Sequence, residues 1–281
     1  MNPSEDKTYL YMKKLVTKNY KLDLFDRFSD NKFIENNEEL KKIGEEIINN
    51  FSKHQNLKIH FFADICAAPG CYSQIILDNF DIINGIGISL PYEEGGVKFE
   101  IEDKKFKKIY KNILDNKYRL DLPIKLDLGI GSCMSYQYNA KISNKLNLQL
   151  IIKSIYLLLP NFKKSSSLII NMSMKNIFIA FNLINIISKY FKNIKLWKSS
   201  NIWATKNTFY LFGYDFIENK NITNELNNLF ILIDNEKNDI YNKFIGTNEE
   251  YNKINKMINN IYYIRINAWK KLIESQNITA N

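Results

Sequence analysis

The segment from Phe61 to Gln74 limits the fold of this chain more than any other stretch. It reads Phe-Phe-Ala-Asp-Ile-Cys-Ala-Ala-Pro-Gly-Cys-Tyr-Ser-Gln, an apolar run with one acidic residue, then small residues and a Pro-Gly turn, then a new apolar stretch. In an α/β sheet, this is the pattern of a buried strand that passes directly into a helix. The segment therefore predicts a strand, a tight turn and a helix.

The predicted turn has the properties of a ligand site. Ala67, Ala68 and Gly70 carry little or no side chain, so a ligand can approach the backbone, and Gly70 can adopt dihedrals closed to other residues. The N–H groups that open the following helix favour a carboxylate or phosphate. Asp64, near the end of the strand, can accept a hydrogen bond from an amine or hydroxyl. A tight turn without a ligand is the alternative.

Apolar periodicity outside this segment predicts an α/β fold with a mostly parallel sheet. The last two strands are joined by a polar loop, which predicts an antiparallel hairpin at the sheet edge. The predicted strands span residues 57–65, 84–90, 97–101, 124–132, 167–172, 194–197 and 208–212. The predicted helices span residues 36–52, 71–80, 104–114, 146–159, 176–191 and 254–272.

Four polar residues are expected at the carboxyl ends of these strands, where open parallel sheets bind ligands. Asp64, Ser89 and Asp103 end the first three predicted strands, and Asp127 precedes Gly129 and Gly131 near the end of the fourth. These side chains are expected to line one rim of the sheet.

Composition favours a polyanionic partner. The chain has 281 residues, with 39 Lys and Arg against 30 Asp and Glu, a formal net charge of +9 and a pI near 9.1. Nucleic acid is the leading candidate, ahead of a membrane surface. Because no apolar run is long enough to span a bilayer and no secretory leader is apparent, the protein is expected to be soluble and intracellular, in the cytoplasm.

Cysteine usage favours reduced thiols and disfavours a metal site. Only Cys66, Cys71 and Cys133 are present, an odd number, with two histidines and no paired C-x-x-C spacing.

Two basic stretches each allow two interpretations. Aromatic and basic residues between Tyr9 and Lys21 suit either single-stranded RNA or an amphipathic helix packed on the core, and the lysines from Lys104 to Lys111 suit either an RNA contact or a solvated helix face.

The order of these pieces resembles the FtsJ-like family of S-adenosylmethionine-dependent RNA 2′-O-methyltransferases over roughly residues 36–214. The segment Asp64–Gln74 is similar to the cofactor loop of that family, and the segment Gly87–Pro91 is similar to its viral and cap-directed members. The resemblance implies a Rossmann-like methyltransferase fold that binds S-adenosylmethionine. It places the methionine part of the cofactor among Asp64, Ala67, Ala68, Gly70, Cys71 and Tyr72, the ribose and adenine near Ser89 and Leu90, and the adenine amine near Asp103.

The catalytic Lys-Asp-Lys-Glu tetrad of the family is matched incompletely. By resemblance the first lysine corresponds to Lys42, with Lys41 as a rival, and the aspartate corresponds to Asp127. The second lysine falls on Asn171, and the glutamate falls on Thr208, or on Asn207 with a shift of one residue. The sequence Lys163-Lys164-Ser165-Ser166 replaces the usual Gly-Gly before the fifth strand.

The resemblance implies three regions: a helical extension over residues 1–35, a methyltransferase domain over residues 36–216, and helices over residues 217–281 that pack on the core. The implied function is methyl transfer to an RNA ribose 2′-hydroxyl of cap or ribosomal type, with RNA as partner and a protein partner in an RNA-processing or capping complex. The alternative is a catalytically impaired member that binds RNA or supports a partner enzyme. A small-molecule or protein methyltransferase is a more distant possibility.

Overall fold

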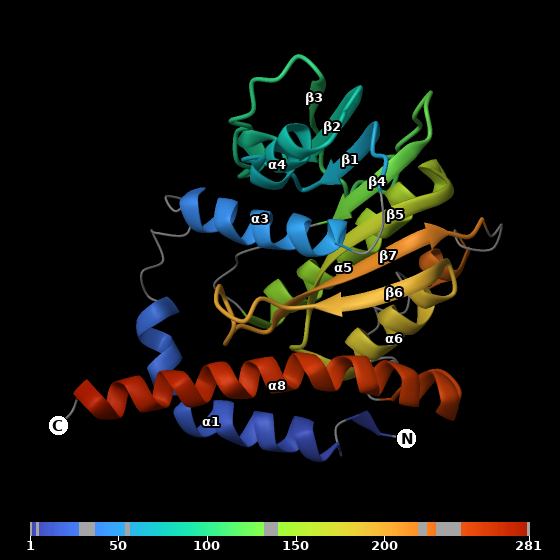
Figure 1. The fold of residues 1–281 in the computed structure, drawn as a ribbon. Coiled ribbons are helices and arrows are strands. Elements are labelled where there is room, and N and C mark those ends of the chain that lie inside the picture. The colour runs from blue at the N-terminus through green and yellow to red at the C-terminus, as the bar shows by residue number, and fades with distance from the viewer. Residues whose placement is uncertain are drawn as a thin grey trace.

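A seven-stranded sheet forms the centre of the computed structural model, which describes residues 2–3, 6–27, 37–53, 57–131, 140–218, 224–228 and 243–279. The strand order is β3-β2-β1-β4-β5-β7-β6 (Figure 1). The strands are β1 (Phe61–Ile65), β2 (Asn84–Ser89), β3 (Phe106–Tyr110), β4 (Leu126–Gly131), β5 (Phe162–Ser173), β6 (Phe191–Trp197) and β7 (Thr208–Phe216).

The pairing confirms the predicted α/β topology. Strands β1 to β5 pair in parallel, whereas β7 is antiparallel to both β5 and β6. The polar loop predicted between the last two strands therefore joins an edge hairpin. Since β7 enters between β5 and β6, its first residue lies at the same sheet edge as the carboxyl ends of β1 and β5.

Helices cover both faces of the sheet and give two hydrophobic clusters. One face carries α3 (Asn37–Ser52) and α4 (Cys71–Asn79) over a cluster that includes Phe51 and Phe62. The other face carries α5 (Ala140–Leu158) and α6 (Ile177–Ser188) over a larger cluster. Two short 3-10 helices, η2 (Tyr92–Glu94) and η3 (Leu159–Asn161), lie in connections.

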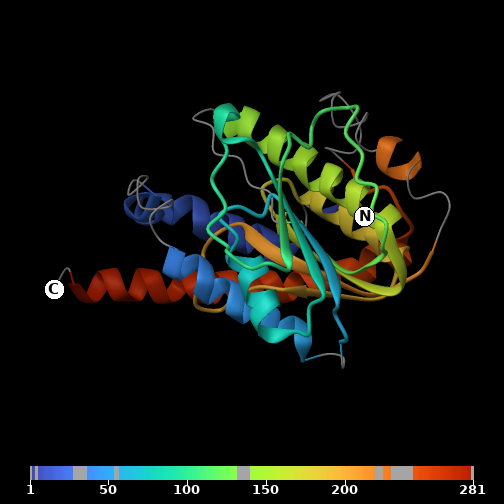
Figure 2. The same cartoon turned by 90° about the horizontal axis from the view of Figure 1, so that it is seen from above.

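Two further helices lie outside the second face. Helix α8 (Asn248–Thr279) packs against α1 (Lys7–Arg27), α6 and β6, and it runs parallel to α1 (Figures 1 and 2). Tyr9 and Tyr262 join the two helices through rings 5.7 Å apart, and Asn255 donates to Asp6 at 3.1 Å. The helical part of the C-terminal region thus packs on the core. Among the described residues, no helix is both long and apolar enough to cross a membrane.

The third strand and the helix predicted after it are wrong. Residues 97–101 have no regular structure, and β3 occupies residues that were predicted as a basic helix. Phe106 is buried while Lys107 and Lys108 are exposed. Because β3 is an edge strand, its lysines discourage pairing with another chain and do not form the solvated face of a helix.

The glycines of β4 lie inside the strand and not in a loop after it. A Cβ on Gly129 would lie 2.7 Å from Phe162, and one on Gly131 would lie 2.7 Å from Ile170. Small residues are therefore required here by the packing of β5 against β4. As a result, Asp127 stands at the amino end of β4, which overturns its predicted place at the carboxyl end.

Candidate functional site

The turn between β1 and α4 is sharply bent and tied to the neighbouring strand. The backbone N–H groups of Cys66 and Ala67 both donate to the carbonyl of Ile88, at 2.7 and 3.1 Å. Cys66 has a φ of 64°, the Ala68-Pro69 peptide is cis, and Gly70 has a φ of 115°. The predicted turn is thus confirmed, with Gly70 in a backbone conformation that favours glycine.

The space beside Gly70 is filled by this protein's own chain. A Cβ on Gly70 would lie 2.5 Å from Cδ1 of Ile101, and the N–H of Glu100 donates to the carbonyl of Pro69 at 2.9 Å. Gly70 therefore permits close packing of the 97–101 segment. This packing is enough to explain why residue 70 is a glycine, without a ligand in the space beside it.

Asp64 is fully buried beneath the turn. Its Oδ2 accepts a hydrogen bond of 2.7 Å from Ser73, whereas Oδ1 has no hydrogen-bond partner among the described residues. Burial raises the pKa of this carboxyl to about 7, and the Ser73 hydroxyl opposes the rise. An unpartnered buried carboxylate oxygen is costly, so a positively charged ligand at the turn would stabilise the ionised form.

The strand registers bring several candidate residues into one row at the carboxyl edge. Ile65 pairs with Ile88, so Cys66 and Ser89 follow side by side, and Asn171 pairs with Tyr210 further along the sheet. The hydroxyl of Tyr210 lies 3.1 Å from that of Tyr72 in the first turn of α4. The cofactor turn and Asn171 therefore belong to one rim.

Asn171 and Tyr210 offer polar but uncharged groups. The Oδ1 of Asn171 is buried without a partner among the described residues. Burial raises the pKa of Tyr210 to about 12 and the pKa of Tyr72 well above its ordinary value, so both phenols are neutral at physiological pH. Half-buried Thr208 begins β7 at the same edge.

Lys41, and not Lys42, lies on the side of α3 that faces the turn. Gly44 of α3 packs against Tyr72 and Ile75, and Lys41 precedes Gly44 by three residues, on the same helix face. The pKa of the Cys71 thiol is raised chiefly by burial, and the charge of Lys41 opposes this rise. Of the two lysines that the sequence left open, Lys41 is therefore the better candidate for the one beside the turn.

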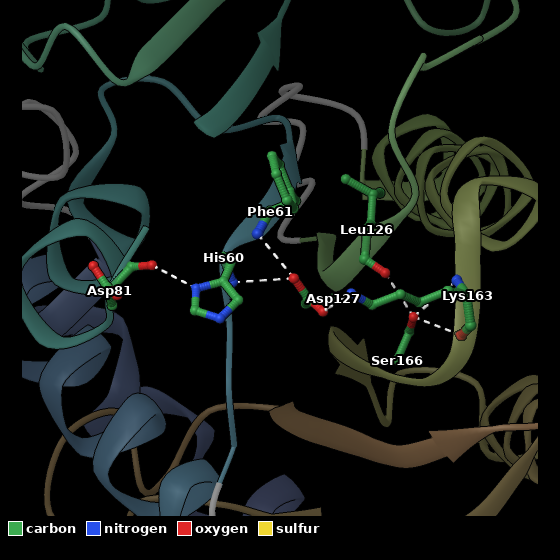
Figure 3. A network of polar contacts seen from close by, with 7 residues as sticks. All are labelled: His60, Phe61, Asp81, Leu126, Asp127, Lys163 and Ser166. Carbon is green, nitrogen blue, oxygen red and sulfur yellow. Dashed lines mark hydrogen bonds and ion pairs between the residues drawn. The ribbon is translucent and has the colours of Figure 1, made fainter. Parts of the chain in front are cut away.

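Asp127 belongs to a polar network at the opposite edge (Figure 3). Its Oδ2 accepts hydrogen bonds of 3.0 Å from the N–H groups of His60 and Phe61, and its Oδ1 lies 2.5 Å from Nζ of Lys163. The level of Asn171 lies about five residues further along β5, or roughly 16 Å. Within the described residues, Asp127 therefore serves strand pairing and not the predicted catalytic site.

Asp103 is likewise absent from the rim on which it was predicted. It precedes β3, beside the amino end of β2, and its Oδ1 accepts from the N–H of Lys105 at 2.7 Å. The N–H of Lys111 donates to the carbonyl of Ser89, so the chain just after β3 still runs beside the end of β2. The next residue at this carboxyl end is Asn112. Sequence reasoning missed Asn112 because it took β3 for a helix.

A buried lysine beside Thr208 was also missed. Lys198 is 4% exposed, and its Nζ donates to the carbonyls of Trp203 and Thr208 at 2.9 and 2.7 Å. Burial lowers the pKa of this amine to about 7, and the charge of Arg265 adds to the fall. Its place in a polar loop gave no sequence signal of burial.

One of the two described cysteines differs from expectation. Cys66 is disulfide-bonded, which corrects the prediction that it is a reduced thiol, whereas Cys71 is free. Cys133 lies outside the described residues. In the part of the chain that the structure describes, no group of three or more His, Cys, Asp or Glu side chains could hold a metal ion.

The fold and the turn agree with a sequence family. A model of FtsJ-like methyltransferases matches residues 39–216. The chain belongs to the FtsJ-like methyltransferase family. Its cofactor is accordingly S-adenosylmethionine, and the buried Asp64 carboxyl at the β1–α4 turn suits a ligand that carries positive charge.

The solved structures that this chain resembles are only distantly similar to it. One, described as a ribosomal RNA methyltransferase from Plasmodium falciparum, is 19% identical with a TM-score of 0.48, over 63% of this chain and 97% of that one. A methyltransferase-like protein from Streptococcus mutans in complex with SAH is 12% identical with a TM-score of 0.41, over 61% and 97%. No curated protein sequence matches. The family assignment rests on the family model.

Proposed function

We propose that this protein binds S-adenosylmethionine at the β1–α4 turn and transfers its methyl group to a ribose 2′-hydroxyl of RNA. The observation that carries the proposal is the bent, small-residue turn above the unpartnered Oδ1 of Asp64, within an FtsJ-like domain. The net charge of +9 supports a polyanionic acceptor.

The turn and the end of β2 would hold the cofactor. Ala67, Ala68, Cys71 and Tyr72 surround the turn, and Ser89 and Leu90 follow β2 on the same rim. Asn112 takes the position at the end of β3 that was assigned to Asp103, and we infer that it, and not Asp103, lies beside the adenine. The cofactor supplies an electrophilic methyl group on a sulfonium.

The acceptor side would act by positioning. Asn171 can accept a hydrogen bond through its unpartnered Oδ1, which would orient the ribose hydroxyl. The hydroxyl oxygen would form the new bond to the methyl carbon as the bond between that carbon and the sulfonium sulfur breaks, which leaves a neutral thioether. The hydroxyl proton would leave to water, because Asn171 and Thr208 cannot take it. Lys41 offers a nearby positive charge for the RNA backbone. Each missing charged group costs on the order of 10²-fold in rate, so slow turnover is expected.

The test is transfer of labelled methyl from S-adenosylmethionine to capped, ribosomal and transfer RNA, followed by nuclease digestion. Label in 2′-O-methylnucleosides is the expected result. Label on a base, or none on any RNA despite tight cofactor binding, would refute the proposal.

A second candidate is a non-catalytic member that binds RNA or supports a partner enzyme. The displacement of Asp127 from the rim, together with Asn171 and Thr208, favours it, because no member of the expected tetrad after the first lysine has a charged match among the described rim residues. Cofactor binding and RNA binding without transfer, together with stimulation of a co-purified methyltransferase, would support this alternative.

A further inference from the structure

We propose that the C-terminal part of α8, with the β6–β7 loop and Tyr11 of α1, binds the RNA strand beside the methyl-acceptor edge. This α8 surface consists of Tyr11, Ser200, Asn267, Lys270 and Lys271. The inference rests on the proposed function, since it assigns the part of the molecule that holds the same RNA outside the methyltransferase domain.

Helix α8 is fixed to the loop that ends at the acceptor edge. Arg265, which is 2% exposed, donates to the carbonyl of Thr205 through Nε and Nη2 at 3.3 and 3.1 Å. Lys198, at the start of the loop, donates to the carbonyls of Trp203 and Thr208. Trp203 is held at a φ of 54°, which an ordinary residue adopts only when its surroundings enforce it.

These contacts give α8 a defined place relative to the acceptor edge. Thr208 begins β7 and pairs with Ser173 at the end of β5, two residues beyond Asn171. Because two buried side chains donate hydrogen bonds to the carbonyls of the loop, its outer surface is a rigid continuation of that edge toward α8. An RNA strand whose ribose reaches Asn171 can therefore extend over the loop onto α8.

A cavity of about 320 Å³ lies where the loop meets α8. Its lining includes Ser200 from the loop and Asn267, Lys270, Lys271 and Glu274 from α8. The two ammonium groups and the neutral donors suit phosphate oxygens, which receive most contacts from nucleic-acid-binding proteins. Glu274 opposes an anion, and the two lysines outnumber it.

An exposed aromatic ring continues the surface on α1. Tyr11 is 49% exposed, and Nζ of Lys270 lies 5.8 Å from its ring centroid. Tyr9, two residues earlier, is instead packed against Tyr262 in the interface of the helices. An exposed ring next to a lysine is the combination by which single-stranded RNA is bound, through base stacking and phosphate contact.

Apart from Glu274, the exposed charge around this surface is mainly positive. The exposed charged side chains of α1 from Lys7 to Lys18 are all lysines, whereas the acidic Glu249 and Glu250 stand at the far, amino end of α8. This distribution favours a long polyanion that passes over α1 and the carboxyl-terminal part of α8. An acidic protein is the competing occupant.

The test compares two charge-matched double variants of the full chain with the wild type. Lys270→Ala with Lys271→Ala removes two charges from the α8 surface. Lys107→Ala with Lys108→Ala removes two exposed charges from β3, which is the outermost strand on the side of the sheet away from β6 and β7. Affinity for a single-stranded RNA is measured across a salt titration, with S-adenosylmethionine affinity as the control for folding. A Tyr11→Ala variant tests stacking.

We expect only the α8 variant to lose about tenfold in RNA affinity. The slope of the logarithm of its binding constant against the logarithm of the salt concentration should fall in magnitude by about 1.4. The Tyr11→Ala variant is expected to lose affinity with an unchanged slope. Equal RNA affinity in the wild type and the α8 variant would overturn this inference and leave the proposed function standing, as would equal losses in both double variants. A wild type that binds no RNA but binds an acidic protein would overturn both.

Discussion

Asp127 and Lys163 form an ion pair that joins β4 to the beginning of β5, at the sheet edge opposite the cofactor turn. The same carboxylate accepts two backbone N–H groups at the start of β1. The aspartate that resembles a catalytic residue in the sequence therefore holds three neighbouring strands together.

Replacing Asp127 by Ala is accordingly expected to lower stability and not cofactor binding. Two partly buried backbone donors would lose their acceptor, at a cost of about 2 kcal/mol in the free energy of unfolding. Lys163→Met should cost only about 0.5 kcal/mol, since the lysine side chain is 47% exposed. Urea unfolding measures both changes. An Asp127→Ala variant with wild-type stability but no methyl transfer would contradict this assignment.

The position of Asp127 shows which part of the fold sequence reasoning could not reach. The order of strands and helices follows from local apolar patterns, and so does the turn at Gly70. Gly129 and Gly131 look like loop residues in the sequence, but they are required by Phe162 and Ile170 from a strand more than thirty residues away. Packing of this kind has no local signal.

The lysines of β3 mislead in a related way. A run of lysines predicts a solvated helix face when its neighbours are unknown, whereas on an edge strand it serves to keep the edge unpaired. Whether residues 106–110 lie at an edge is decided by the order of the whole sheet. The same error placed Asp103, and not Asn112, at the carboxyl end of a strand.

Asp64 is expected to release a proton when S-adenosylmethionine binds. Its pKa of about 7 exceeds the ordinary value of 3.8, so its contribution to stability is full below about pH 4 and is lost as the pH rises through 7. The positive sulfonium and amine of the cofactor favour the ionised carboxylate. Calorimetry at about pH 6, in buffers of different ionisation enthalpy, should detect release of up to about one proton.

The Asp64→Asn variant provides the matched control for this experiment. It keeps the shape of the side chain and an oxygen for the Ser73 hydroxyl, but it cannot ionise. Proton release near pH 6 should disappear, and the free energy of unfolding should no longer fall between about pH 4 and pH 7 through this group. Unchanged proton release in the variant would assign the titration to another residue.

Asn171→Leu is expected to separate stability from activity. The substitution removes a buried amide oxygen without a described partner, so the free energy of unfolding should rise by about 1 kcal/mol. If Asn171 orients the ribose hydroxyl, single-turnover methyl transfer should fall by about 10²-fold, with S-adenosylmethionine affinity unchanged. Transfer at the wild-type rate would remove Asn171 from the acceptor site.

Gly70 and Gly95 form a matched pair for testing how the cofactor turn is built. Both have positive φ, of 115° and 88°, but a Cβ on Gly70 meets Ile101 at 2.5 Å whereas one on Gly95 meets nothing within 4 Å. Gly95→Ala should therefore cost only backbone strain, about 1 kcal/mol, and Gly70→Ala about 3 kcal/mol.

The difference between the two variants should belong to Ile101. In a double-mutant cycle, Ile101→Ala should recover part of the loss caused by Gly70→Ala, because it removes the side chain that the new methyl group meets. Denaturant unfolding gives the coupling energy, and S-adenosylmethionine titration reports whether the turn keeps its shape. Strictly additive effects would mean that the 97–101 segment does not press on the turn, and that the bend at Gly70 is set by its backbone alone.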